Sequence, residues 1–162
     1  MQKPTLAATM FLLLALTLSA PAAFAAGGGG SDPVWPAEPE DPNYTAGKKA
    51  AEAMNWQAAL EAFEKVASKD PSNANAQNYL GYVNRKMGKL DLAFKYYDEA
   101  LRLDPKHRGA HEYVGEAYLM AGNLPKAEEH LQVLDRLCFF SCEEFRELKQ
   151  AIAEYKQKTA SK

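Results

Sequence analysis

The stretch LGYVNRKMGKLDLAFKYYDEALRLDP, residues 80–105, decides the fold of this chain. Its apolar residues recur at helical spacing on both sides of Gly88, which predicts two helices joined by a short turn. A step of 34 residues in either direction returns the same residue types. The matching sets are Ala46-Gly47, Leu80-Gly81 and Val114-Gly115; Ala59, Ala93 and Ala127; and Phe63, Tyr97 and Leu131.

Small residues at fixed places in each copy indicate close packing of helices. Gly81 and Gly115 leave room for a neighbouring helix, and the repeated alanines do the same from the second helix of each hairpin. Large residues at the position of Tyr97 fill the gap between copies. Since no hairpin can bury its apolar face alone, we predict an all-α stack of three hairpins over residues 43–140.

These residues resemble the tetratricopeptide repeat family, whose signature has Leu-Gly in the first helix, Ala-x3-Phe in the second and a closing Pro. The middle copy fits best, with Leu80-Gly81, Ala93 to Tyr97, and Pro105. The first copy departs at Ala46 and Met54, and the third lacks the closing Pro. The resemblance covers residues 43 to about 157 and implies a right-handed α-solenoid of three repeats that serves as a scaffold for partner proteins.

The C-terminal part reads as a capping helix over residues 141–157, followed by a tail over 158–162. Phe145, Leu148, Ile152 and Tyr155 recur at spacings of three and four residues and form one apolar stripe. Arg146, Glu147, Lys149, Gln150 and Glu154 form the polar face of the same segment. Because the open end of a repeat stack exposes apolar surface, we expect this helix to cover it and to turn its polar face to water.

The first 25 residues have the features of a cleavable signal peptide. Lys3 precedes an apolar stretch that is too short to span a bilayer comfortably, and Ala23-Phe24-Ala25 fits the small-x-small cleavage rule. A linker rich in Gly and Pro follows over residues 26–42, and no second apolar run of that kind comes after it. We therefore expect an exported protein without a membrane span after cleavage, in the periplasm of a Gram-negative bacterium.

The charge balance and the motif content exclude several classes of function. The 162 residues contain 19 basic and 21 acidic side chains, a net charge of −2, so the basic surface typical of nucleic-acid binding is absent. No phosphate-binding loop, zinc-protease motif or nucleophile elbow occurs in the sequence. We predict a protein that is not an enzyme, holds no cofactor or metal, and takes no small-molecule substrate.

Cys138 and Cys142 are the sharpest local feature, in a C-x3-C spacing across the turn before the capping helix. In an oxidising compartment, two cysteines this close are expected to form a disulfide, which would fix the angle of the cap. The alternative is a copper(I) or thiol-redox site, since soft thiolates suit that metal. The spacing leaves both readings open, and the second would make the chain a periplasmic metal-binding or redox protein.

The remaining hypothesis concerns a groove that the first helices of the repeats would line. The exposed stripes of these helices carry aromatic and amide groups, which suit capture of a peptide backbone. Basic residues gather toward one end of the predicted groove and acidic residues toward the other, so we expect an extended peptide with an acidic and a basic part. The predicted partner-binding residues are Tyr44, Lys48, Asn75, Asn78, Tyr79, Tyr82, Arg85, Glu112, Tyr113 and Glu116.

The resemblance does not extend to one binding mode found in the family. Some members hold an acidic C-terminus with a cluster of Lys and Asn side chains. The corresponding positions of this chain are Tyr44, Lys48, Tyr79, Gly109 and Tyr113, of which only Lys48 is compatible with that mode.

Overall fold

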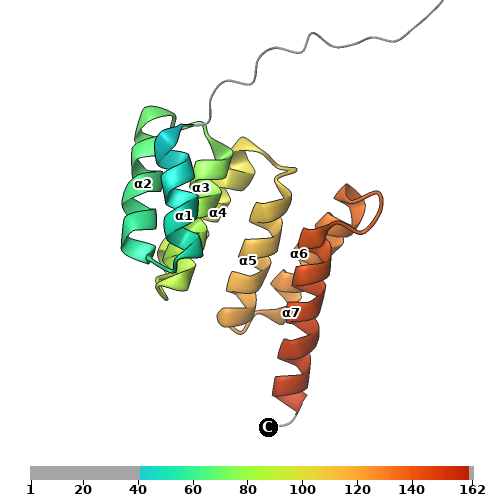
Figure 1. The fold of residues 1–162 in the computed structure, drawn as a ribbon. Helices are drawn as coiled ribbons and strands as arrows, with labels where there is room; N and C mark the ends of the chain where they lie inside the picture. Colours follow the sequence, from blue (N-terminus) through green and yellow to red (C-terminus); the bar gives the residue numbers. More distant parts are fainter. Residues whose placement is uncertain (1–40, 161–162) are drawn as a thin grey trace, which may run out of the picture. The chain divides into compact units, whose positions relative to one another are not determined.

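The computed structural model describes residues 41–160, which form seven α-helices and no strand within that range. Successive helices run antiparallel as hairpins (Figure 1). This confirms the predicted all-α stack of hairpins. The helices are α1 (Pro42–Glu52), α2 (Trp56–Lys69), α3 (Ala74–Lys86), α4 (Leu90–Leu103), α5 (Arg108–Met120), α6 (Leu124–Leu137) and α7 (Glu143–Ala160).

The helices begin where polar side chains satisfy the free N–H groups of the first turn. Asp41, Asn55, Asn73 and Asn123 each accept a hydrogen bond from a backbone N–H of the helix that follows. His107 does the same for α5, with its Nδ1 atom 3.1 Å from the Ala110 nitrogen. These caps fix the starts of α1, α2, α3, α5 and α6 from local sequence alone.

The turns inside the hairpins need a residue in the left-handed region of backbone space. Gly88 and Gly122 adopt φ of 77° there, and Met54 adopts φ of 56° at the equivalent turn of the first hairpin. Met54 is therefore a replacement of the turn glycine that keeps the turn geometry at a conformational cost of about 1 kcal/mol.

Within the first two hairpins, a glycine of one helix receives an aromatic ring of the next. A Cβ atom on Gly47 would lie 2.8 Å from Cζ of Phe63, and one on Gly81 would lie 2.5 Å from Cε1 of Tyr97. Both rings are fully buried. The close approach predicted at these glycines is thus confirmed for the first two copies. The rings, expected between copies, also fill a gap inside each hairpin, while Phe63 stacks on Tyr79 of the next hairpin and Tyr97 packs with Val114 of the third.

The third hairpin departs from this arrangement. A Cβ atom on Gly115 would lie 2.6 Å from Cδ2 of Leu148, which belongs to α7 and not to α6. Leu131, which we expected to fill this gap, is only half-buried, whereas Leu134 and Leu148 are fully buried. Leu131 packs against the cluster that contains Leu148 and Ile152 of α7, as expected for a residue between copies, but its side chain is shorter than the Phe or Tyr of the other copies and Leu148 takes the space at Gly115.

Two boundaries differ from the expected ones. The first helix begins at Pro42, which the sequence analysis placed in the linker, and α7 covers Glu143–Ala160 where a cap over 141–157 was expected. The predicted signal peptide and the linker up to residue 40 lie outside the described residues.

Candidate functional site

All of the predicted partner-binding residues line cavities along the first helices of the three hairpins and α7. The cavity near the N-terminal ends of α3 and α5 has a volume of about 410 Å³, and we call it the acidic cavity. Its lining residues are Tyr44, Asn75, Asn78, Tyr79, His107, Gly109, Glu112, Tyr113, Glu143, Glu144 and Glu147. A smaller one of about 200 Å³, the tyrosine cavity, is lined by Lys48, Ala51, Glu52, Tyr79, Tyr82 and Tyr113.

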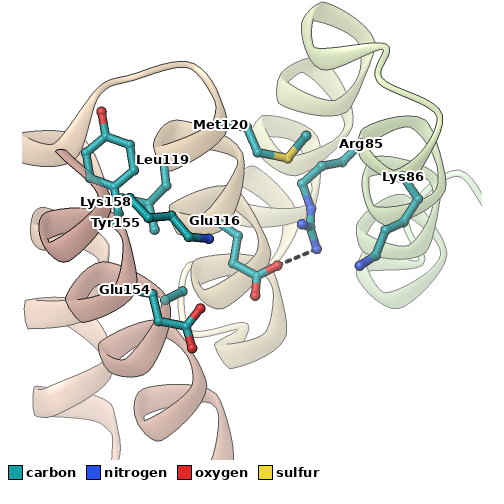
Figure 2. Close-up of a pocket in the computed structure, with 9 residues that line it drawn as sticks. Arg85, Lys86, Glu116, Leu119, Met120, Glu154, Tyr155 and Lys158 are labelled. Carbon is teal, nitrogen blue, oxygen red and sulfur yellow. Dashed lines mark ion pairs between the residues drawn. The ribbon is translucent and has the colours of Figure 1, made fainter. Parts of the chain in front are cut away.

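A third cavity of about 420 Å³ lies between α3, α5 and α7, and we call it the ion-pair cavity. Figure 2 shows Arg85 of α3 directed at Glu116 of α5, with Glu154, Tyr155 and Lys158 of α7 on the other side. Tyr79 and Tyr113 line both of the first two cavities. A further hollow shares Glu147 with the acidic cavity and Glu116 and Glu154 with the ion-pair cavity, so the cavities follow one another as one groove along α1, α3, α5 and α7.

The tyrosines of the groove pack on one another as well as facing it. The ring of Tyr82 lies 4.9 Å from that of Tyr113, and the ring of Tyr79 stacks on Phe63 at 4.6 Å. Burial raises the pKa of Tyr82 and of Tyr113 above the ordinary value, so both hydroxyl groups stay protonated at neutral pH. The tyrosines therefore offer a fixed aromatic floor with hydroxyl donors.

Arg85 and Glu116 do not belong to opposite ends of the groove. The Arg85 guanidinium forms an ion pair with the Glu116 carboxylate, and its Nε atom donates to the Tyr97 hydroxyl at 3.3 Å. Arg85 is 5% exposed and lies over the rings of Tyr82 and Tyr113. The predicted sorting of opposite charges along the groove is therefore wrong for this pair, because α3 and α5 bring the two side chains into contact.

Net negative charge gathers instead in the acidic cavity. Glu112 is 4% exposed, and burial, followed by a hydrogen bond with Glu147 and the nearby Glu116 and Glu144, raises its pKa to about 9. Glu112 is thus protonated at neutral pH and donates to the Glu147 carboxylate. Glu144 also forms a salt bridge with Arg108, with 3.5 Å between Glu144 Oε1 and Arg108 Nε. The carboxyl groups of the cavity therefore offer several hydrogen-bond acceptors to a bound cation. Such a cation could also displace the proton that Glu112 carries.

The part that α7 takes in the groove was not predicted. We expected the charged face of this helix to meet only water, but Glu147 lines the acidic cavity and Glu154 the ion-pair cavity. The 34-residue period could have predicted it. A step of 34 residues leads from Leu80 to Val114 and on to Leu148, and all three side chains are buried. The same step shows that α7 occupies the place of the first helix of a fourth repeat.

The three histidines occupy two separate places. His107 caps α5, and its Nε2 atom lies 3.1 Å from Asn75 Oδ1. His111 Nε2 donates to the Pro105 carbonyl at 3.1 Å, so its Nδ1 atom accepts from His130 Nδ1 at 2.9 Å. Burial, with the nearby His111 adding to it, lowers the pKa of His130 to about 4, and burial also lowers the pKa of His111. Both rings of the pair are neutral at pH 7.

Cys138 and Cys142 are joined by a disulfide, with Cα atoms 5.5 Å apart, at the turn between α6 and α7. Ser141, inside that turn, adopts φ of 23°, and the side chains of Phe139 and Phe140 are largely exposed. Over residues 41–160, no group of three or more His, Cys, Asp or Glu side chains has an arrangement that could hold a metal ion.

The comparisons with known proteins agree with this architecture. The family model described as "Tetratricopeptide repeat" matches residues 44–107 and 85–138. The TPR repeat-containing thioredoxin TTL4 of Arabidopsis thaliana is 31% identical over 90 residues, which are 53% of this chain and 13% of that protein. The chain therefore spans only a small part of the length of this curated relative.

Two solved structures show the same fold at low sequence identity. The TPR2B domain of yeast Sti1, solved as a complex with pHsp70, has a TM-score of 0.65 at 18% identity, and the match covers 72% of this chain and 94% of that chain. The chaperone SycD of Yersinia enterocolitica, solved with a peptide of the translocator YopD, has a TM-score of 0.61 at 22% identity and covers 72% of this chain and 92% of that chain.

Proposed function

The chain belongs to the tetratricopeptide repeat family, and we propose that it is a non-enzymatic adaptor that binds a segment of a partner protein in its groove. The observation that carries this proposal is the row of three cavities along α1, α3, α5 and α7. The tyrosines, Asn75 and Asn78 along this row suit contact with a peptide backbone, because an amide side chain both donates and accepts.

Two similar structures support a peptide as the partner. SycD was solved with a peptide of YopD, and the TPR2B domain of Sti1 with pHsp70. The groove of our chain differs in charge along its length: carboxylates crowd the acidic cavity, whereas Lys48 lines the tyrosine cavity and Lys86 and Lys158 line the ion-pair cavity. We therefore propose an extended segment whose basic part lies at the acidic cavity and whose acidic part lies toward these lysines.

Site-specific photocrosslinking in cells of the source organism tests this proposal. A photoreactive benzoylphenylalanine replaces Tyr82 in the tyrosine cavity, and in a matched control it replaces Leu92, an apolar side chain of α4 that is 42% exposed and outside the groove. We expect a discrete crosslinked protein from position 82 and none from position 92. Equal crosslinking from both positions, or none from position 82, would contradict a groove-bound segment.

We further propose that the adaptor works in the cell envelope. The signal-peptide pattern of residues 1–25 supports export, and the Cys138–Cys142 disulfide is compatible with an oxidising compartment. Over the described residues, none of the helices has the length and apolar character needed to cross a membrane. Mass spectrometry of protein from the periplasmic fraction should give an N-terminus at Ala26, whereas an intact N-terminus in the cytoplasmic fraction would contradict export.

A further inference from the structure

The acidic cavity contains a buried acceptor that no group in residues 41–160 satisfies. Asn78 is 4% exposed, lines this cavity, and its Oδ1 atom has no hydrogen-bond partner among the described residues. A buried carbonyl oxygen without a donor is costly, by about 1–3 kcal/mol, and a native structure holds few of them. This oxygen therefore points to a ligand that donates hydrogen bonds.

The other polar groups of the cavity also favour a ligand that donates hydrogen bonds. Glu112, Glu144 and Glu147 place carboxyl oxygens around it, and one basic group, Arg108, reaches this set through its salt bridge with Glu144. A cation with several N–H groups would satisfy Asn78 Oδ1 and the carboxylates together. The cluster of carboxylates and the orphaned amide oxygen are independent observations that agree on this chemistry.

Aromatic groups narrow the choice of cation. The ring of Tyr113 lines the acidic cavity beside Glu112. A guanidinium group is planar, presents five N–H donors and stacks on aromatic rings, whereas an ammonium group is a compact and strongly hydrated charge. The protein already uses this combination once, where the Arg85 guanidinium lies over the rings of Tyr82 and Tyr113 and pairs with Glu116.

The preceding segment of the chain lacks such a group. Residues 26–40 contain no Lys or Arg, and Asp32, Glu38 and Glu40 make them acidic. A segment of that composition would be repelled by Glu112, Glu144 and Glu147. Residues 1–40 and 161–162 contain no Arg, so an arginine in the acidic cavity would come from another molecule.

We propose that the acidic cavity binds an arginine side chain of the partner segment, with its guanidinium donating to Asn78 Oδ1 and to the Glu112 and Glu147 carboxylates. This inference rests on the proposed function, since it places one residue of the segment that the groove binds. It deepens that function by naming the residue type that specifies the partner at this end of the groove.

Binding of the guanidinium should also release a proton. Glu112 is protonated in the free protein, and the charged or titratable groups that face it are Glu116 on α5, Glu144 and Glu147 on α7, and the hydroxyls of Tyr82 and Tyr113. A bound cation favours the carboxylate form of Glu112. Calorimetric titrations in two buffers of different ionisation enthalpy would therefore differ in their heat by a fraction of a proton per site, at pH values below 9.

The direct test is an NMR titration of the purified, isotopically labelled protein with N-acetyl-arginine amide. We expect shifts at the Asn78 side-chain amide and at the backbone amides of Glu112 and Glu147. N-acetyl-citrulline amide, which has nearly the same shape without the charge, should leave these signals in place, and N-acetyl-lysine amide should bind several-fold more weakly. Equal shifts with all three probes, or stronger binding of calcium chloride at the same residues, would overturn the assignment to arginine.

A matched pair of variants localises the effect. Glu147→Gln lies on the exposed face of α7, so it leaves the fold intact and removes one carboxylate from the cavity. It should weaken the arginine amide about tenfold. Glu154→Gln, the same change two turns later on α7, lies outside the acidic cavity and should leave binding unchanged. Unchanged binding in Glu147→Gln, or an equal loss in Glu154→Gln, would contradict the proposed site.

The outcomes separate this inference from the adaptor function. If position 82 crosslinks a partner but arginine amide does not bind the acidic cavity, the arginine assignment is wrong and the adaptor function stands. If arginine amide binds while position 82 captures nothing, the cation site stands and the groove-bound segment is contradicted.

Discussion

The second and the third hairpin solve the same packing problem in different ways. In the second, the gap at Gly81 is filled by Tyr97 from the same hairpin, and in the third the gap at Gly115 is filled by Leu148 from α7. The residue that matches Tyr97 is Leu131, which is shorter and only half-buried. The shorter side chain at position 131 thus coincides with a change of the helix that packs against the glycine, from the second helix of the hairpin to α7.

As a consequence of this difference in packing, α7 lines one side of the groove. Because Leu148 packs against Gly115, its neighbour Glu147 lies against Glu112, and the acidic cavity is formed between α3, α5 and α7. The second hairpin has no carboxylate at the equivalent place, since the residue 34 positions before Glu112 is Asn78. The departure from the repeat pattern therefore coincides with the most distinctive chemistry of the molecule.

The largest expected effect separates the two packing solutions. Tyr97→Ala should lower the free energy of unfolding by about 4 kcal/mol, because it removes a fully buried ring and the partner of Arg85. Leu131→Ala, at the matching position, should cost about 1–2 kcal/mol, because Leu148 occupies the gap. Urea unfolding followed by circular dichroism measures both. Equal losses would show that Leu131 fills the third repeat after all.

The next effect concerns the carboxyl group that the third repeat buries. In the folded chain the pKa of Glu112 is about 9, against an ordinary value of 4.5, so the folded state keeps a proton that the unfolded chain releases. The stability that this proton gives is complete below pH 4.5 and is lost as the pH rises toward 9.

Glu112→Gln keeps the shape of the protonated group and removes its titration. The variant should be more stable than the wild type by about 2 kcal/mol at pH 8 and show little difference at pH 5. Thermal unfolding across this pH range checks the sign, and Glu154→Gln serves as the control on α7. A difference that is constant with pH would mean that Glu112 titrates normally.

The smallest expected change in stability concerns Gln77 and His111, which occupy matching positions in the second and third hairpins. Gln77 donates its Nε2 atom to the Pro71 carbonyl at 3.4 Å in the second hairpin, and His111 donates to the Pro105 carbonyl at 3.1 Å in the third. The pKa values of His111 and His130 are lowered, so the stability of this pair is present above about pH 6.5 and is lost as the pH falls toward 4.

His111→Gln gives the third hairpin the residue of the second. Between pH 7.5 and pH 5 the variant should lose about 1 kcal/mol less stability than the wild type, since it keeps a donor for Pro105 and removes one titrating ring. Parallel urea titrations at the two pH values measure this difference. An identical loss in both proteins would exclude the histidine pair as the source of acid sensitivity.

The comparison also shows how far the sequence alone leads. The 34-residue period, the turn glycines and the capping Asn residues predict the hairpins, since these features act locally or repeat at a fixed spacing. The stripe of the first helices likewise predicts which side chains line the groove. Those predictions depend on helical geometry that every copy shares.

The rest depends on contacts between segments that the period does not describe. The ion pair of Arg85 with Glu116 follows from the spacing of α3 and α5, and the burial of Glu112 follows from the position of α7. From the sequence pattern alone, Arg85, Glu112 and Glu116 are expected on the solvent-exposed face of their helices. Only the packing of Leu148 on Gly115 shows that α7 closes the groove and brings its carboxylates together.

The central claim is that a partner segment lies in the groove of α1, α3, α5 and α7, and it is tested most directly by a crystal structure of the chain with the segment captured through position 82. We expect contacts of the segment with these four helices and an arginine within hydrogen-bonding distance of Asn78 Oδ1 and the Glu112 carboxylate. A segment bound to the faces of α2, α4 and α6, with the acidic cavity left open, would contradict it.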